Sequence, residues 1–542
     1  MFKLKGTPMS QQQVFERLSQ ALQRGALSRR AVLRLALGAG AFALLPGAIR
    51  AQSRSRFVDY PFQLGVASGY PTPDGFTLWT RLAPSPLADD GGMGADEQIE
   101  VHWEVAEDVH FGTVLRSGKV IAVGEHAHSV HADVDGLAAD HWYYFRFLAG
   151  GEVSVVGRTR TAPATGAAVT GMKFALGSCQ HFEQGWFNAY PHLIADAPDL
   201  MCFVGDYIYE SSWGDDLVRR HARAEPYSLI DYRARYAQYK TDPGLQAAHA
   251  AMPWIVTWDD HEVDNDWAGS QSERLDPRFL QRRAAAFQAF VEHMPLPVSI
   301  RRSLGDSLQL HTLAAFGGLA NFFVLDDRQY RSPQPCPDQA KGGGSTVFTA
   351  TDCPALDSKT LTMLGDAQER WLGQQLKASR AQWNVIVQQT LLSPMDNNPA
   401  AGNQVWTDGW DGYPAARSRL IEQLAQPTLR NPLVIGGDVH ASVVCDVKRD
   451  TRADSKAVAA EVCGTSMASQ GWPQAHYDEL RPVNPHLQHV RSDQRGYALF
   501  ELGRAEAQIA LRVVESVKTV QSPISTQARF RIEDGVRGVQ SA

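Results

Sequence analysis

The sequence predicts an α/β protein with an all-β domain at residues 57–162 and a layered α/β domain at residues 171–520. In the first part, short segments alternate apolar and polar side chains. In the second part, short apolar strands alternate with helical segments, as in layered α/β folds. Small, turn-prone residues at 162–171 are typical of a linker between the two parts.

The first part is predicted to be an immunoglobulin- or fibronectin-like β-sandwich. Segments 76–82, 100–105 and 142–147 alternate apolar and polar side chains, which indicates strands with one buried face. Strands at this spacing within about 100 residues are typical of a small sandwich.

The second part contains four apolar strands that end in polar residues. These strands are expected at 174–179, 200–206, 254–260 and 433–438. Helices are expected at 229–239, 278–293, 366–378 and 415–424. With 542 residues, the chain is long enough for more than one hydrophobic core.

Residues 1–51 have the organisation of an export signal. Arg29 and Arg30 precede an apolar run at 35–45, and a small-residue cleavage site ends at Ala51. The run is too short to span a bilayer. Paired arginines in this setting indicate a twin-arginine signal, with an uncleaved anchor or an ordinary secretory signal as alternatives. We therefore expect the twin-arginine export machinery as a partner, no stable membrane span, and a periplasmic or secreted protein.

The charge of the chain gives no reason to expect a nucleic-acid partner. Its formal net charge is -7, and no long basic run follows residue 60. An acidic protein can still bind phosphate where metal ions supply positive charge.

The cysteines are compatible with export. Cys336 and Cys353 bracket a loop rich in Gly, Ser and Thr, and we predict that they form a disulfide. Cys445 and Cys463 lie in strand-like segments and are a second candidate pair. Cys202 is expected to be a buried, inert thiol.

Potential metal ligands stand at all four strand ends of the second part. Because ligands bind at strand ends in open α/β sheets, we expect these side chains to gather at one site. The clusters are Cys179 within 177–180, Asp206 with Tyr207 and Tyr209 within 205–210, the acidic segment 258–266, and Asp438 with His440 within 436–440. A buried carboxylate is costly alone, and a bound metal compensates for it.

Each cluster also has a simpler interpretation. Cys179 taken alone is more often a structural thiol, and a tyrosine is more often a core residue with a bonded hydroxyl. The segment 258–266 holds five acidic residues and a histidine in nine positions, which is also compatible with a calcium-stapled or solvated loop. Asp438 alone is compatible with a capping residue in a turn. The four clusters together are far more specific than any one of them.

The order strand-Cys, strand-Gly-Asp, strand-Asp-His, strand-Gly-Asp-x-His resembles the calcineurin-like metallophosphoesterase superfamily. Ser-Cys-Gln at 178–180 replaces the first Asp-x-His of that plan. With this replacement, the sequence resembles the PhoD-like alkaline phosphatases, a family that includes phospholipase D-like phosphodiesterases. Further matching segments lie at 65–71, 78–82, 231–237, 325–332, 410–413 and 464–466, so the resemblance covers roughly residues 60–520.

The resemblance implies an iron(III) and calcium site. The ligands implied for iron are Cys179, Asp206, Tyr209 and His440. A thiolate and a phenolate together favour a high-valent transition metal, with zinc as the alternative. Calcium prefers oxygen ligands, and those implied here are Asp206, Asp260, Asp438 and Asn265.

One position departs from the family. The family usually has Asn-Asn at 265–266, whereas this chain has Asn265 and Asp266. If the second amide contacts phosphate, Asp266 would weaken anion binding.

The expected reaction is attack of an oxygen nucleophile on phosphorus, with metal ions neutralising the developing charge. His261 is the candidate proton donor to the leaving oxygen, oriented by Glu262 or Asp259. The adjacent Asp260 is also a candidate catalytic residue. Arg235 or Arg328 could clamp phosphate bidentately, or could instead pair with the surplus aspartates.

Three functions are open from the sequence. The first is an exported alkaline phosphatase that hydrolyses phosphate esters, and the second is a phosphodiesterase or phospholipase D-like enzyme. The third is a non-enzymatic exported binding protein that works through its β-sandwich. The insertion at 333–360 and the tail after Leu502 are candidates for a lid over the site.

Overall fold

The computed structural model describes residues 57–542, except 338–339, 345–346, 401 and 453. The predicted export signal at 1–51 lies outside the described residues. Within the described part of the chain, no helix has both the length and the apolar character needed to cross a bilayer.

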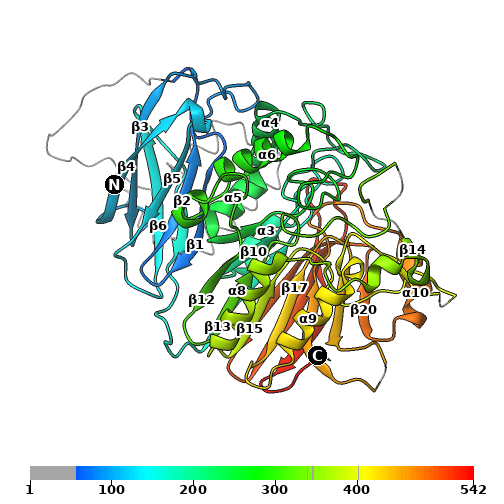
Figure 1. Cartoon of the computed structure of the whole chain (residues 1–542). Coiled ribbons are helices and arrows are strands. Elements are labelled where there is room, and N and C mark those ends of the chain that lie inside the picture. The colour runs from blue at the N-terminus through cyan, green and yellow to red at the C-terminus, as the bar shows by residue number, and fades with distance from the viewer. Residues whose placement is uncertain (1–56, 338–339, 345–346, 401, 453) are drawn as a thin grey trace. The chain divides into compact units, whose positions relative to one another are not determined.

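A ten-stranded mixed sheet runs through the molecule (Figure 1). Its strands, in spatial order, are β24 (Gln540–Ser541), β23 (Ile524–Glu533), β22 (Glu506–Val514), β21 (Arg495–Gly503), β9 (Gly171–Gly177), β10 (Leu200–Val204), β11 (Trp254–Thr257), β1 (Val66–Thr72), β2 (Gly75–Arg81) and β5 (Ser129–Val134). The central strands β9, β10 and β11 are parallel, so their carboxyl ends meet at one edge.

A second sheet of seven strands packs against the first. In order, its strands are β12 (Thr312–Phe316), β13 (Ala320–Val324), β15 (Trp383–Val387), β17 (Pro432–Gly436), β19 (Ala457–Cys463), β18 (Ser442–Lys448) and β20 (Leu487–Arg491). The two sheets share one hydrophobic core, in which the rings of Phe174 and Phe322 lie 5.1 Å apart. Helices α8 (Gly365–Ala378) and α9 (Pro414–Leu424) share a second core with the seven-stranded sheet (Figure 1).

The N-terminal part does not have a sheet pair of its own. Strands β3 (Gln98–Ala106), β4 (Val114–Val123), β6 (Trp142–Ala149), β7 (Glu152–Val153) and β8 (Gly157–Arg160) form a five-stranded sheet. Its apolar face packs on β1, β2 and β5, which belong to the ten-stranded sheet. The reason is that β1 pairs with β11 through Gly69 and Trp254, so the large sheet continues into this region.

The four predicted helices are present, within one residue at each end. They are α4 (Leu229–Lys240), α6 (Phe279–His293), α8 and α9. Helix α4 begins at a capping box of Ser228 and Asp231, and it buries Tyr232, Tyr236 and Tyr239 at helical spacing. The described residues also form the helices α3 (Tyr190–Asp196), α5 (Pro243–Ala251), α7 (Val298–Arg301) and α10 (Gln474–Leu480), and short 3₁₀ turns at Gly124–His126, Ala350–Asp352, Pro354–Asp357, Trp410–Gly412 and Arg481–Val483.

The predicted disulfide between Cys336 and Cys353 is confirmed. It closes the segment that contains β14 (Val347–Thr349), which pairs with β16 (Gln404–Trp406) in a two-stranded ribbon. Cys445 and Cys463 are free thiols, so the second candidate bridge is not formed. In the register of β18 and β19, Cys445 faces Glu461 and Cys463 faces Val443.

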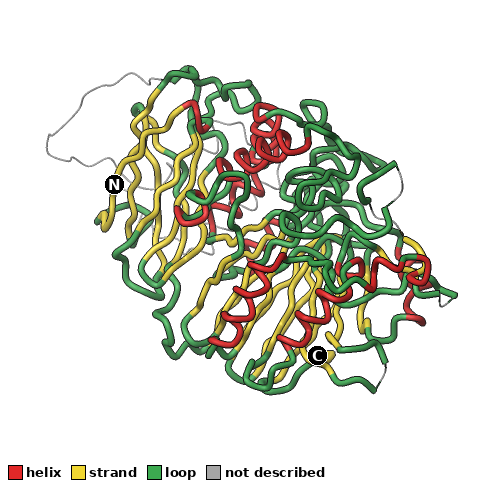
Figure 2. Tube along the Cα trace, viewed as in Figure 1, coloured by secondary structure: helices red, strands yellow, loops and turns green. Residues whose placement is uncertain are grey.

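The tail after Leu502 is not a lid. It forms β22, β23 and β24 at the edge of the ten-stranded sheet. Its alternating apolar residues, including Ala507 and Ile509, are buried in the core between the sheets. Loops gather instead at one end of the two sheets, where the central strands stop (Figure 2).

Candidate metal and phosphate site

The candidate ligands stand directly after strand ends, on unusual backbone. Cys179 follows β9, Asp206 follows β10, and Asp438 and His440 follow β17. All four have left-handed φ angles, between 52° and 65°. This conformation is uncommon for residues other than glycine, and backbone strain of this kind gathers at functional sites.

Gly205 allows the loop after β10 and the loop after β11 to approach each other closely. Its φ is 107°, and a Cβ atom there would lie 2.4 Å from the backbone nitrogen of Asp259. A larger residue would push the loop after β11 away from the loop after β10. The backbone N–H of Cys179 also donates to the carbonyl of Gly205, so the loop after β9 is joined to the loop after β10.

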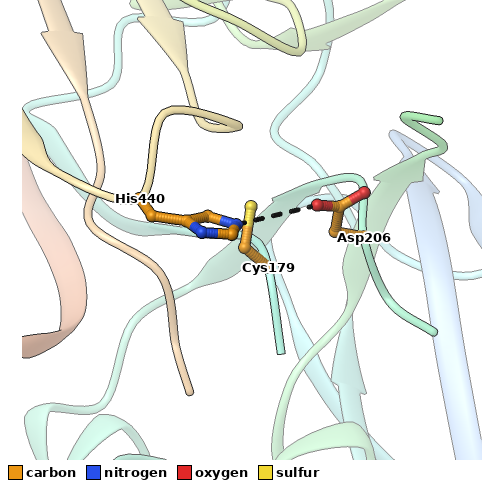
Figure 3. Close-up of side chains that lie close together, drawn as sticks. All are labelled: Cys179, Asp206 and His440. Atoms are coloured by element: carbon orange, nitrogen blue, oxygen red, sulfur yellow. Dashed lines mark ion pairs between the residues drawn. The ribbon is translucent and has the colours of Figure 1, made fainter. Parts of the chain in front are cut away.

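Four predicted iron ligands converge. The hydroxyl of Tyr209 donates to Oδ2 of Asp206 at 2.7 Å and lies 3.0 Å from Nε2 of His440. The sulfur of Cys179, a carboxylate oxygen of Asp206 and a ring nitrogen of His440 all lie within 4.8 Å of one another. Figure 3 shows these three side chains pointing toward one another.

The protonation of this cluster fits a cation. Burial, reinforced by the charge of Asp206, raises the pKa of the Cys179 thiol and of the Tyr209 phenol well above their usual values. Both groups are therefore neutral unless a cation stabilises their ionised forms. Nδ1 of His440 donates to the carbonyl of Gln470 at 2.5 Å, which leaves Nε2 as a lone-pair donor.

An orphaned acceptor lies in the same place. Oδ1 of Asp206 is buried without a hydrogen-bond partner among the described residues. A buried, unpaired carboxylate oxygen is costly, and a cation between Asp206, Cys179 and His440 would satisfy it. The residues present therefore fit a bound metal ion.

Oxygen ligands extend from this cluster. Asp206 and Asp260 form a group of potential ligands with His261, and Asp260 forms another with Asp266 and Asp408. Burial opposes ionisation of Asp260, but His261, Arg328 and the backbone N–H of Asp266 together lower its pKa below the usual value. The acidic side chain of Asp266 thus stands in an oxygen-rich group suited to a hard cation.

Two further predicted calcium ligands lie at the same cavity. Asp438 accepts a hydrogen bond from the hydroxyl of Thr390 at 2.6 Å. The side-chain amide of Asn265 donates to Glu273 at 3.1 Å, and this hydrogen bond uses its nitrogen. Both residues line the cavity that also contains Asp206, Asp260 and His440.

His261 is oriented by Glu210, which is not the carboxylate expected. Nδ1 of His261 lies 2.6 Å from Oε2 of Glu210. Burial lowers the pKa of His261, but Glu210, Asp260 and Asp206 outweigh burial and raise it well above the usual value.

The two carboxylates expected to orient His261 have other partners. Glu262 accepts the backbone N–H groups of Asp206, Tyr207 and Asp259, which fixes the loops to each other. Asp259 pairs with Arg328. Neither carboxylate is therefore assigned to His261.

The two candidate phosphate clamps are held in structural contacts. Arg235 donates to the backbone carbonyls of Tyr209, Glu210, Arg223 and Ala224. Arg328 is fully buried and pairs with Asp259 and Asp408. Neither arginine lines the cavity, so their structural interpretation is the one that the contacts favour.

The structure separates the two tyrosines after β10. The hydroxyl of Tyr207 lies 2.8 Å from Nε2 of His249, away from the ligand cluster, whereas that of Tyr209 lies within it. His181 does not line the cavity, and its ring packs 4.5 Å from that of Tyr209.

The ligand residues open into a cavity of about 300 Å³. This volume is at the small end of ligand-binding pockets. Its polar lining includes Asp206, Asp260, His261, Asp438 and His440.

Comparison with known proteins gives the family. A family model described as PhoD-like phosphatase matches residues 174–511, and one for its N-terminal domain matches residues 48–163. Alkaline phosphatase D of Bacillus subtilis (strain 168) is 42% identical over 513 residues, which cover 91% of this chain and 85% of that protein. The chain belongs to the PhoD-like phosphatase family. A solved structure of PhoD is 41% identical, with a TM-score of 0.85, and the match covers 90% of this chain and 93% of that one.

Membership of the PhoD-like phosphatases confirms the predicted resemblance and the assignment to the phosphoric ester hydrolases. It also confirms the mixed α/β content of the fold. Sequence reasoning missed Glu210, Asp408 and Gln470 as parts of the site. Glu210 was visible as the last residue of Gly-Asp-Tyr-Ile-Tyr-Glu, but Asp408 and Gln470 follow no predicted strand.

Proposed function

We propose that this protein is an exported, metal-dependent alkaline phosphatase that hydrolyses phosphate esters by metal-activated attack of oxygen on phosphorus. The observation that carries the proposal is the convergence of Cys179, Asp206, Tyr209 and His440 beside the carboxylates of a single cavity. Such a donor set suits a metal centre that binds an anion in an otherwise acidic pocket.

The proposed metals are Fe³⁺ and Ca²⁺, with Zn²⁺ as the alternative to iron. Iron would be held by Cys179, Asp206, Tyr209 and His440. Soft sulfur and phenolic oxygen favour a transition metal at this position. Calcium would be held by Asp206, Asp260, Asn265 and Asp438, whose oxygen atoms suit a hard cation. When bound, these ions would neutralise charge on the phosphoryl oxygens and activate the nucleophilic oxygen.

His261 is proposed to protonate the leaving oxygen of the ester. Because Nδ1 is engaged by Glu210, Nε2 is the nitrogen that can deliver a proton. The raised pKa of His261 favours its protonated form, which a proton donor requires. Asp260 adds to this effect and also anchors the loop, because it accepts the backbone N–H groups of His261 and Asp266.

Arg235 and Arg328 are proposed to position the site without contacting phosphate. Arg235 holds the carbonyls of Tyr209 and Glu210, which are the candidate iron ligand and the partner of His261. Arg328 joins the loop after β11 to Asp408.

A phosphodiesterase, including a phospholipase D-like enzyme, is the second candidate. The observation that favours it is the extent of the cavity, which continues past the ligand cluster to Met395, Trp406 and Trp472. This extension leaves room for a substituent on the phosphate. A non-enzymatic binding protein has no such support.

We also propose that the chain is exported by the twin-arginine route to the periplasm or beyond the cell. The disulfide between Cys336 and Cys353 supports an oxidising compartment. The domain boundaries proposed remain 57–162 for an immunoglobulin- or fibronectin-like sandwich and 171–520 for a metallophosphoesterase domain. The apolar residues of β1, β2 and β5 pack against those of the five-stranded sheet, and this packing supports the proposed sandwich.

The test is a rate comparison with mature protein purified with its metals. One aryl phosphate monoester and one aryl diester are compared in calcium buffer. A faster monoester rate supports the alkaline phosphatase, and a faster diester rate moves the assignment to the phosphodiesterase. Hydrolysis of neither ester by metal-loaded protein would contradict both.

A further inference from the structure

The cavity has an aromatic lining that the metal and phosphate chemistry does not use. On the side of α10, its lining includes the rings of Trp406, Trp472, His476 and Tyr477. Trp406 comes from β16, Trp472 from the loop before α10, and the other two from α10 itself. Figure 1 shows β14, the partner of β16, close to α10.

Three of these rings form a continuous group, here called the aromatic wall: Trp406, Trp472 and His476. The ring centres of Trp406 and Trp472 are 5.6 Å apart, and those of Trp472 and His476 are 4.4 Å apart. The wall is exposed, since Trp472 retains 46% of its accessible surface. Clustered exposed aromatic rings beside a polar pocket mark a surface that binds a ligand.

The wall is held at a set position relative to the metal ligands. The carbonyl of Gln470 accepts a hydrogen bond from Nδ1 of His440, and Trp472 follows Gln470 by two residues. Between them, Gly471 packs so closely that a Cβ atom would lie 2.6 Å from the carbonyl oxygen of His440. The carbonyl of Trp472 in turn accepts a hydrogen bond from the hydroxyl of Ser492 at 2.7 Å. The backbone under the indole is therefore pinned on both sides.

Trp406 is presented by the disulfide-closed ribbon. Val405 is buried in a small cluster with Cys353 and Leu356. Because side chains alternate along a strand, the neighbouring Trp406 points to the other face, where it meets Trp472. The insertion at 333–360 thus supports one edge of the pocket.

We infer that the aromatic wall binds a flat ring in the organic part of the substrate, next to the phosphate that the ligand cluster holds. This inference rests on the proposed function and adds the substrate class to it: small phosphate esters that carry an aromatic ring. An aromatic side chain can stack on any flat aromatic ring, because every such ring has a π-face. A cavity of about 300 Å³ suits one such ring better than a polymer or a long acyl chain.

The ring can come from two sources, an aromatic alcohol or a nucleobase. The test therefore compares phenyl phosphate, adenosine 5′-monophosphate and glycerol phosphate with metal-loaded wild-type protein and the variants Trp472→Ala and Trp472→Phe. Trp142→Ala is the matched control, because Trp142 stacks under Arg158 in the five-stranded sheet and does not line the cavity.

We expect Trp472→Ala to lower kcat/KM on the order of tenfold for the ring-bearing ester that fits, mainly through KM. The loss for glycerol phosphate is expected to be at least fivefold smaller. Trp472→Phe should restore most of the loss, and Trp142→Ala should change none of the three. Which ring-bearing ester responds more identifies the source. Equal losses on all three esters, or no loss on either ring-bearing ester, would overturn the inference.

Binding separates this inference from the proposed function. Calorimetry with phenylphosphonate and methylphosphonate needs no turnover. If wild-type protein hydrolyses none of the three esters, the proposed function fails, and tighter binding of phenylphosphonate that is lost in Trp472→Ala still supports the wall. Equal affinity for the two phosphonates would overturn it.

Discussion

Nδ1 of His261 lies 2.6 Å from Oε2 of Glu210, and both side chains are buried. Glu210 is one of the carboxylates that raise the pKa of His261. A proton donor works below its pKa, and its activity is lost as the pH rises through that value. Glu210→Gln removes the negative charge and should lower the pKa of His261, so the alkaline limb of the kcat profile should move to lower pH.

The measurement is kcat against pH for wild-type protein and Glu210→Gln. Glu225→Gln is the control, since Glu225 pairs with Arg282 and does not line the cavity. If the alkaline limb stays in place in Glu210→Gln, His261 is not the proton donor.

Tyr209→Phe should reduce the iron content of the purified protein more than tenfold, because it removes a phenolic ligand that lies between Asp206 and His440. Tyr207→Phe is a close control, since its hydroxyl contacts His249 instead of the cluster. Elemental analysis by mass spectrometry measures both. Equal iron in the two variants would rule out Tyr209 as a ligand.

The strand ends of the site could be predicted because the sequence marks them locally. Each of Cys179, Asp206 and Asp438 closely follows an apolar run. Parallel pairing brings the ends of β9 and β10 to one edge, whereas β17, which precedes Asp438, belongs to the seven-stranded sheet. Helix α4 could be predicted from its capping residues and tyrosine spacing.

The remaining features depend on contacts across long sequence distances. The partner of His261 is 51 residues away, and Gln470 contacts His440 across 30 residues. No local pattern distinguishes Glu210 from Glu262 as the orienting group. The tail after Leu502 was wrongly predicted as a lid, because β22 and β23 extend the sheet from β21. The other partner of β21 is β9, more than 300 residues earlier.

Arg328→Met should destabilise the protein by about 3–5 kcal/mol, because it leaves buried Asp259 without its ion-pair partner. Asp408 also loses Arg328 but keeps its pair with Arg331. Arg430→Met breaks the exposed pair with Asp534 and should cost about 1 kcal/mol or less. Denaturant unfolding of both variants measures the difference. Similar losses in the two would show that Arg328 does not hold the site together.

Replacing both Arg29 and Arg30 by Lys should keep the precursor in the cytoplasm, because a twin-arginine signal requires the pair. Arg24→Lys lies in the same segment outside the pair and serves as the control. Cell fractionation with an activity assay follows the protein. Unchanged export of the double variant would point to the ordinary secretory signal.

We propose that Cys179, Asp206, Tyr209 and His440 form the metal centre of a phosphate-ester hydrolase. The most direct measurement is the hydrolysis rate of an aryl phosphate in purified protein before chelation, after removal of all metal, and after iron and calcium are returned. We expect activity to be lost on chelation and restored only when metal is returned to wild-type protein, and the His440→Ala variant to stay inactive. Full activity after complete metal removal, or full activity of His440→Ala, would contradict it.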